Sequence, residues 1–290
     1  MMKPQIIEAK GLLVKSKLPD TDYVVNPYVG CEFACQYCYA SFMGRFVNEE
    51  FQNWGNYLYV KGNAETVFEK DLLRLRASGG KPSILLSSVT DPYQGAEKKH
   101  RITRGILEIL AREPYPGVVS ILTKSPLVER DIDLLSRLPG AEIGMTITTT
   151  DDAISRFLEV RAPLATRRLQ TLSRLGKAGL KTYAFVGPLL PHFRYQPDQL
   201  DKLFQGIADA GVRSVYVEHM NLKQYIRERL WKVLSDQPRE IRDVYQQATE
   251  ADHREALDEI VSRLLTKHGL RLRLNEVLYH NQNGTTPRSE

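Results

Sequence analysis

Short apolar runs alternate with longer stretches of helical periodicity through most of the chain. The runs read as strands at residues 22–25, 83–88, 118–122, 143–148, 181–186 and 212–217. Helical periodicity covers residues 102–112, 131–138, 166–178, 197–210 and 222–234. Continuous apolar strands that alternate with helices are typical of a parallel sheet with helices on its faces. The pattern therefore predicts an α/β fold, either barrel-like or open.

The C-terminal part of the chain carries a different pattern. Residues 250–268 have the periodicity of an amphipathic packing helix, with Gly269 as its C-cap, and residues 270–274 alternate like a late strand. The predicted organisation is an N-terminal segment (1–22), a core (23–222), a C-terminal helical extension (223–280) and a flexible polar tail (281–290).

Polar residues gather where the predicted strands end. In chain order these groups are Ser87, Ser88, Thr90 and Asp91; Thr123, Lys124 and Ser125; Thr148, Thr149 and Thr150; Pro188; and Glu218, His219 and Asn221. In a β/α barrel the carboxyl ends of the strands share one face, and that face carries the chemistry. The groups therefore predict a shared active-site rim.

Composition narrows the class of protein. The 290 residues are 42% hydrophobic and 26% charged, as in an ordinary globular protein. No apolar run approaches the roughly 20 residues of a membrane helix, and the first residues are too polar for a secretion signal, so we expect a cytoplasmic protein without a membrane partner. The net charge of +5 is compatible with a nucleic-acid partner, but solvated helix faces explain it equally simply.

All three cysteines of the chain lie within eight positions, at Cys31, Cys35 and Cys38. An odd, tightly clustered set does not build a disulfide framework, so the thiols are candidate metal ligands. A four-iron cluster takes four thiolates, and three would leave one iron open to a small molecule. The alternative is a zinc site, which would need a distant fourth ligand because no second cysteine pair exists.

The spacing C-x3-C-x2-C, with Tyr37 before the third cysteine, resembles the cluster loop of the radical S-adenosylmethionine (SAM) superfamily. The resemblance implies a partial (β/α)6 barrel with a C-terminal helical extension. It implies a [4Fe-4S] cluster on Cys31, Cys35 and Cys38, with SAM on the open iron. An external one-electron reductant of the flavodoxin or ferredoxin type would drive cleavage of SAM to a 5′-deoxyadenosyl radical.

Further motifs narrow the resemblance to the spore photoproduct lyase-like group, whose members are often labelled DNA repair photolyase. In order they are Asn26-Pro27-Tyr28, Thr90-Asp91-Pro92-Tyr93-Gln94, Thr103-Arg104, Leu122-Thr123-Lys124-Ser125, Arg130-Asp131, Arg161-Ala162-Pro163 with Arg168, and Gly187-Pro188-Leu189-Leu190-Pro191. The set covers roughly residues 6–222.

The matching motifs imply cofactor contacts. Thr90 takes the place that contacts the amino group of SAM, and Lys124 takes that of the basic contact to its carboxylate, with Thr146 as a hydroxyl partner. Arg161 is a candidate for the ribose or the carboxylate, or for a brace to the loop through Glu159. Asp91 is a candidate to orient Thr90 or the substrate, or simply to cap a turn.

One departure from the group concerns hydrogen transfer. In spore photoproduct lyase a cysteine at the end of the second strand donates hydrogen to the product radical, and here that position is Ser88. A hydroxyl O–H bond is far too strong to replace a thiol S–H bond in that role. Tyr37 and Tyr39, which flank the third cluster cysteine, match the tyrosines that relay hydrogen in the lyase, or they only stack on the cofactor.

The sequence therefore predicts a radical SAM enzyme of unidentified substrate that lacks the cysteine hydrogen donor. Two other functions stay open at this point. A non-catalytic iron–sulfur redox or regulatory protein would not need Thr90, Lys124 and Thr146 around its cluster. A zinc-stabilised nucleic-acid-binding module would need a fourth ligand and a basic face with exposed aromatic residues. A radical SAM enzyme that acts on nucleic acid is also compatible, since Lys98, Lys99, Arg101 and Arg104 follow the second strand.

Overall fold

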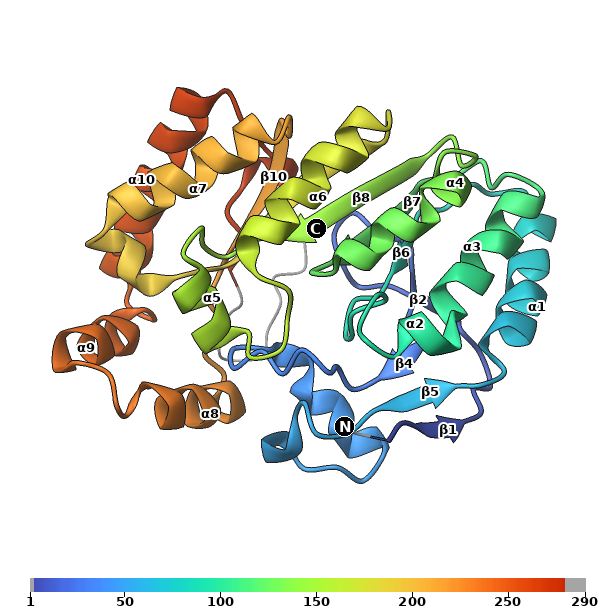
Figure 1. The fold of residues 1–290 in the computed structure, drawn as a ribbon, viewed down its shortest axis with the longest axis horizontal. Coiled ribbons are helices and arrows are strands. Elements are labelled where there is room, and N and C mark those ends of the chain that lie inside the picture. Colours follow the sequence, from blue (N-terminus) through green and yellow to red (C-terminus); the bar gives the residue numbers. More distant parts are fainter. Residues whose placement is uncertain (1–2, 280–290) are drawn as a thin grey trace.

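The computed structural model describes residues 3–279 and contains a large curved sheet and a small one (Figure 1). The large sheet has the strand order β11-β10-β9-β8-β7-β6-β3-β2, and every neighbouring pair is parallel except β2 with β3. Its strands are β2 (Leu13–Lys15), β3 (Tyr23–Val25), β6 (Ile84–Leu86), β7 (Val119–Thr123), β8 (Ala141–Thr146), β9 (Lys181–Leu189), β10 (Ser214–His219) and β11 (Arg271–Leu272). The predicted α/β fold is confirmed, and the six predicted strands form an open partial barrel.

Several strand ends differ from the predicted ones. Strand β6 stops at Leu86 because Ser87 adopts a left-handed backbone, with φ of 70°. Pro188, predicted to follow a strand, lies inside β9, and Glu218 and His219 form the end of β10 instead of the loop after it. The predicted late strand is shortened to β11, because Leu274 has a φ of 64°.

The small sheet has no counterpart among the predicted elements. It has the order β1-β5-β4, formed by β1 (Gln5–Ile7), β5 (Tyr59–Lys61) and β4 (Tyr28–Val29). These strands have two or three residues, too few for a period to show. Strand β4 leads directly into the cysteine segment, so this sheet supports the base of that loop.

The α-helices of the described chain are α1 (Ala64–Ala77), α2 (Glu97–His100), α3 (Ile102–Arg112), α4 (Ile132–Leu135), α5 (Asp152–Leu158), α6 (Ala165–Lys177), α7 (Pro197–Asp209), α8 (Gln224–Leu234), α9 (Arg239–Gln247) and α10 (Ala251–His268). Most of them flank the large sheet, but α8 and α9 lie away from its outer face (Figure 1). Helices α1 and α3 pack together at one end of the sheet and α7 and α10 at the other (Figure 1). Gly269 ends α10 in the left-handed conformation, as predicted.

Apolar side chains between sheet and helices form two buried clusters, one around β3, β6 and β7 and one around β8, β9 and β10. The second cluster includes Cys31 and Cys35, so the cysteine segment is part of the core. Within residues 3–279, no helix combines the length and the apolar character that a membrane crossing requires. The division at residues 22, 222 and 280 stays a prediction, and the tail 281–290 lies outside the described residues.

Candidate functional site

The cysteine loop starts at a glycine that no other residue can replace without strain. Gly30 has a φ of 91°, and a Cβ at this position would lie 2.5 Å from the carbonyl oxygen of Tyr57. Ala34 has a φ of 54°, which turns the chain between the first two cysteines. The amide of Cys38 then bonds the carbonyl of Cys35 at 3.2 Å. These turns hold the three cysteines on one compact loop.

The segment after α5 braces this loop from the side. Cys35 forms a β-bridge with Glu159, and the amide of Arg161 bonds the carbonyl of Phe33 at 3.1 Å. The Arg161 guanidinium donates to the carbonyl of Gly55. The structure shows no hydrogen bond between the Arg161 side chain and the Glu159 carboxylate, which has other partners. Both roles named for Arg161, a contact to SAM and a brace through Glu159, stay predictions.

A buried ion-pair network lies behind the loop. Glu159, with no exposed surface, accepts hydrogen bonds from the Arg168 guanidinium, the Tyr37 hydroxyl and, at 3.1 Å, the Ser155 hydroxyl. The Nζ of Lys124 lies 3.9 Å from Glu159 and 5.8 Å from the centre of the Tyr37 ring. Burial alone would raise the pKa of Glu159, but Arg168 and Lys124 outweigh it and hold that pKa below its ordinary value.

Burial disfavours the thiolate form of the three cysteines, and one nearby cation offsets part of that effect. Burial raises the pKa of all three, that of Cys35 to about 12, and the charges of Cys35 and Cys38 would raise the pKa of Cys31 further. Lys124 acts in the opposite direction and lowers the pKa of Cys35 and Cys38. Among residues 3–279, no three His, Cys, Asp or Glu side chains are grouped to hold a single metal ion.

Ser88 and Tyr39 come together at the end of β6. The Tyr39 hydroxyl donates to the main-chain carbonyl of Ser88, and the Ser88 hydroxyl accepts from the Asn26 side chain at 3.3 Å. Asn26 also accepts from the amides of Ser88 and Val89. Tyr37, whose hydroxyl is bound to the Glu159 carboxylate, has no such contact with Ser88. The two tyrosines of the predicted relay therefore have different hydrogen-bond partners.

Thr90 and Gln94 join this strand end to the start of the cysteine loop. The Thr90 hydroxyl donates to the carbonyl of Gly30 at 2.5 Å and accepts from the Gln94 amide at 3.0 Å. Gln94 accepts in turn from the amide of Glu32. A hydroxyl has one proton and two lone pairs, so Thr90 keeps one lone pair for a further donor. An ammonium group is such a donor.

Asp91 links the ends of two neighbouring strands. Its carboxylate accepts from the amide of Tyr93 at 2.9 Å, from the Thr123 hydroxyl at 2.7 Å and from the amide of Lys124 at 2.8 Å. Of the alternatives for Asp91, the structure shows a turn cap, and it shows no hydrogen bond from this carboxylate to Thr90. Through these bonds Asp91 sets the backbone position from which Lys124 extends.

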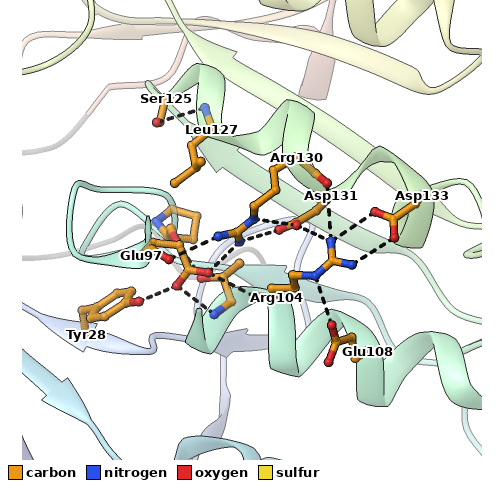
Figure 2. Close-up of polar contacts among 11 residues, drawn as sticks. Tyr28, Glu97, Arg104, Glu108, Ser125, Leu127, Arg130, Asp131 and Asp133 are labelled. Carbon is orange, nitrogen blue, oxygen red and sulfur yellow. Dashed lines mark hydrogen bonds and ion pairs between the residues drawn. The ribbon is translucent and has the colours of Figure 1, made fainter. Parts of the chain in front are cut away.

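A second buried network fixes the loop between β6 and α3 (Figure 2). Glu97, with no exposed surface, accepts from Tyr28 and, at 2.8 Å, from Arg130. Arg104 bonds Asp131 at 2.7 Å and pairs with two further carboxylates, those of Glu108 and Asp133. The guanidinium of Arg104 is therefore bound by carboxylates of this chain. Lys98, Lys99 and Arg101 are exposed.

Some residues of the site had no role in the sequence-based prediction. Arg168 and Gln94 stood inside matching motifs, but only their contacts show what they hold. Thr146 is buried, and its carbonyl accepts from Arg168 at 3.1 Å. Outside the site, the Arg273 guanidinium lies 4.8 Å from the Tyr183 ring centre and pairs with Glu142.

Two uncharacterised proteins are similar to this chain in sequence. The uncharacterised protein MJ0683 of Methanocaldococcus jannaschii is 35% identical over 218 residues, which cover 75% of this chain and 77% of that protein. The uncharacterised protein Rv2578c of Mycobacterium tuberculosis is 30% identical over 258 residues, with 86% and 75% coverage.

Among solved structures, spore photoproduct lyase complexed with dinucleoside spore photoproduct superposes with a TM-score of 0.69 at 14% identity, over 92% of this chain and 80% of that one. A variant of the same enzyme with bound AdoMet gives a TM-score of 0.68. At this identity the likeness concerns the fold. The family model described as the radical SAM superfamily matches residues 25–204, and the chain belongs to that superfamily of enzymes.

Proposed function

We propose that this radical SAM enzyme holds a [4Fe-4S] cluster on Cys31, Cys35 and Cys38 and uses it to cleave SAM reductively. When bound, the two cofactors would supply a 5′-deoxyadenosyl radical that takes a hydrogen atom from the substrate. The observation that carries the proposal is the turned loop that gathers all three cysteines of the chain, two buried and one half-buried, beside Thr90 and Lys124 at the carboxyl ends of β6 and β7.

The residues around the loop fit the cofactors. An anionic cluster needs nearby positive charge in a buried site, and the charges of Lys124 and Arg168 oppose the rise that burial causes in the pKa of the Cys35 thiol. Lys124 is also the charged donor that would bind the SAM carboxylate, with Thr146 as its predicted hydroxyl partner. The lone pair left on Thr90 would accept from the SAM amino group. Asp91 would hold these two strand ends in register.

Ser88 limits the fate of the product radical after hydrogen abstraction. All three cysteines of the chain are committed to the cluster loop, so no thiol is available as a hydrogen donor. We therefore infer that the product radical rearranges, eliminates, is regenerated, or is quenched by Tyr39 or solvent. Repair of spore photoproduct by the lyase's own route is not the reaction we propose.

Reductive cleavage of SAM needs an electron from outside the protein. All three cysteines of the chain lie in one loop, so no cysteines remain to hold a second cluster that could supply it. We propose a small reductant of the flavodoxin or ferredoxin type. A nucleic-acid substrate is a second candidate, supported by the exposed Lys98 and Lys99 of α2 and by Arg101 at its C-terminal end. Reversing the charge of Lys98 and Lys99 would then weaken retention of DNA or RNA at low salt, and an unchanged salt profile would exclude this candidate.

The test of the main proposal is formation of 5′-deoxyadenosine. The protein is purified without oxygen, reconstituted with iron and sulfide, and mixed with SAM and a strong reductant. We expect 5′-deoxyadenosine from the wild type and none from Cys35→Ala. Iron binding without cleavage, with or without candidate substrates, would favour a redox or regulatory protein. Stoichiometric zinc in place of iron would contradict the proposal.

A further inference from the structure

Helix α8 belongs to the region beyond residue 204, where the family model ends, yet it reaches the cysteine loop. Arg229 of α8 donates from Nε to the carbonyl of Gln36 at 2.8 Å and from Nη2 to the carbonyl of Cys38 at 2.6 Å. These residues are 193 and 191 positions apart in the sequence. The contact is therefore a tertiary clamp on the segment between the second and third cysteines.

Two further contacts hold α8 against the loop. The Tyr225 hydroxyl donates to the carbonyl of Tyr39 at 3.0 Å, and the Tyr225 ring stacks on Phe51 with centres 5.0 Å apart. Nη1 of Arg229 lies 3.5 Å from the carbonyl of Phe51. The guanidinium is thus fixed by carbonyls from both sides of the third cysteine, and its planar fork suits this arrangement better than an ammonium group would.

The charge of Arg229 has no acidic partner among residues 3–279. Its side chain is mostly buried, its hydrogen bonds go to neutral carbonyls, and no described carboxylate lies within ion-pair distance. Burying a cation without an opposite charge is costly. The arrangement makes sense if an anion is bound beside it, and the nearest candidates are the thiolates of Cys35 and Cys38.

We propose that Arg229 is a positioning residue that clamps the cysteine loop and raises the reduction potential of the cluster bound there. The inference rests on the proposed function. A cluster gains negative charge when it accepts an electron, so a fixed positive charge beside it stabilises the reduced form more than the oxidised one. Net charge is one of the means by which proteins set such potentials, and the guanidinium that Arg229 fixes beside the loop supplies a positive charge.

The experiment compares reconstituted wild type with Arg229→Met, Arg229→Gln and Arg229→Lys, without SAM. The matched control is Arg227→Met, which removes an exposed arginine two positions earlier on the same helix. Iron and sulfide are counted, and the reduced cluster is followed by electron paramagnetic resonance during a redox titration. In parallel, hydrogen exchange of residues 33–40 is measured in the metal-free proteins.

We expect the neutral variants to shift the reduction equilibrium about tenfold toward the oxidised cluster, which corresponds to about 59 mV for a one-electron couple. Arg229→Lys should recover most of this shift, and Arg227→Met should stay within about twofold of wild type. Amides 33–40 should exchange faster in Arg229→Met than in Arg227→Met.

An unchanged potential in an Arg229→Met or Arg229→Gln protein with full iron content would overturn the proposal. Unchanged exchange in the metal-free protein would overturn the clamp even if neither neutral variant held iron. A wild-type protein that binds no iron would instead refute the proposed function and would leave the exchange comparison as the test of the clamp.

Discussion

The buried pair of Glu159 and Arg168 allows a quantitative test of how the cysteine loop is supported. Both side chains have no exposed surface, so solvent does not screen their interaction. Glu159→Gln keeps the volume and one acceptor oxygen but leaves the Arg168 charge buried without a counter-charge. Breaking a buried pair in this way costs about 3–5 kcal/mol, a large share of the roughly 5–15 kcal/mol that stabilises a typical protein.

Urea unfolding of the metal-free protein measures this cost. With a slope of about 3 kcal/mol per molar urea, the midpoint should fall by about 1 M. The matched control is Glu129→Gln, which breaks the ion pair between Glu129 and Arg174. Arg174 lies on α6, as Arg168 does, but this pair is more exposed: 24% for the Glu129 side chain and 49% for that of Arg174. That change should cost no more than about 1 kcal/mol. Equal midpoints for the two variants would refute the argument that the Glu159 network supports the loop.

Three further predictions rest on single contacts. Gly30→Ala should lower iron uptake on reconstitution, measured against Gly179→Ala, because a Cβ at Gly30 meets the Tyr57 carbonyl whereas one at Gly179 meets nothing within 4 Å. Thr90→Val should weaken SAM binding by about tenfold in calorimetry with no change in iron content, and equal affinity would remove Thr90 from the cofactor site. Burial lowers the pKa of His253 from 6.5 to about 4, so below pH 6.5 the unfolded chain binds a proton that the folded protein does not. The wild type should therefore lose stability between pH 7 and pH 5. The free energy of unfolding of His253→Phe should fall less over the same range.

The sequence predicted the parallel strands because each is a continuous apolar run long enough to show. It could not show the small sheet, whose strands have two or three residues. It identified Cys31, Cys35 and Cys38 as candidate metal ligands because the three lie close together in the sequence. The residues that surround these cysteines come from distant parts of the sequence.

Contacts between distant segments explain the rest of what the sequence did not predict. The sequence suggests Glu159 only as a partner for Arg161, and its actual partner Arg168 is evident from the packing of α6 against β8. Arg229 lies outside every matching motif, and no periodicity distinguishes it from the neighbouring Arg227. Long-range polar contacts of this kind depend on tertiary packing, which a single sequence does not encode in a readable pattern.

The small sheet has a consequence for the smallest piece of this chain that can fold. Residues 25–204, the part matched by the family model, omit strands β1, β2, β10 and β11, all of β3 except Val25, and helices α8, α9 and α10. Such a fragment would leave β5, β6 and β9 as bare edges, which invite aggregation, and would remove the helix that carries Arg229. The segment that the family model matches is therefore shorter than the segment we expect to fold. A fragment that ends at residue 204 would lack the helix whose Arg229 bonds the cysteine loop.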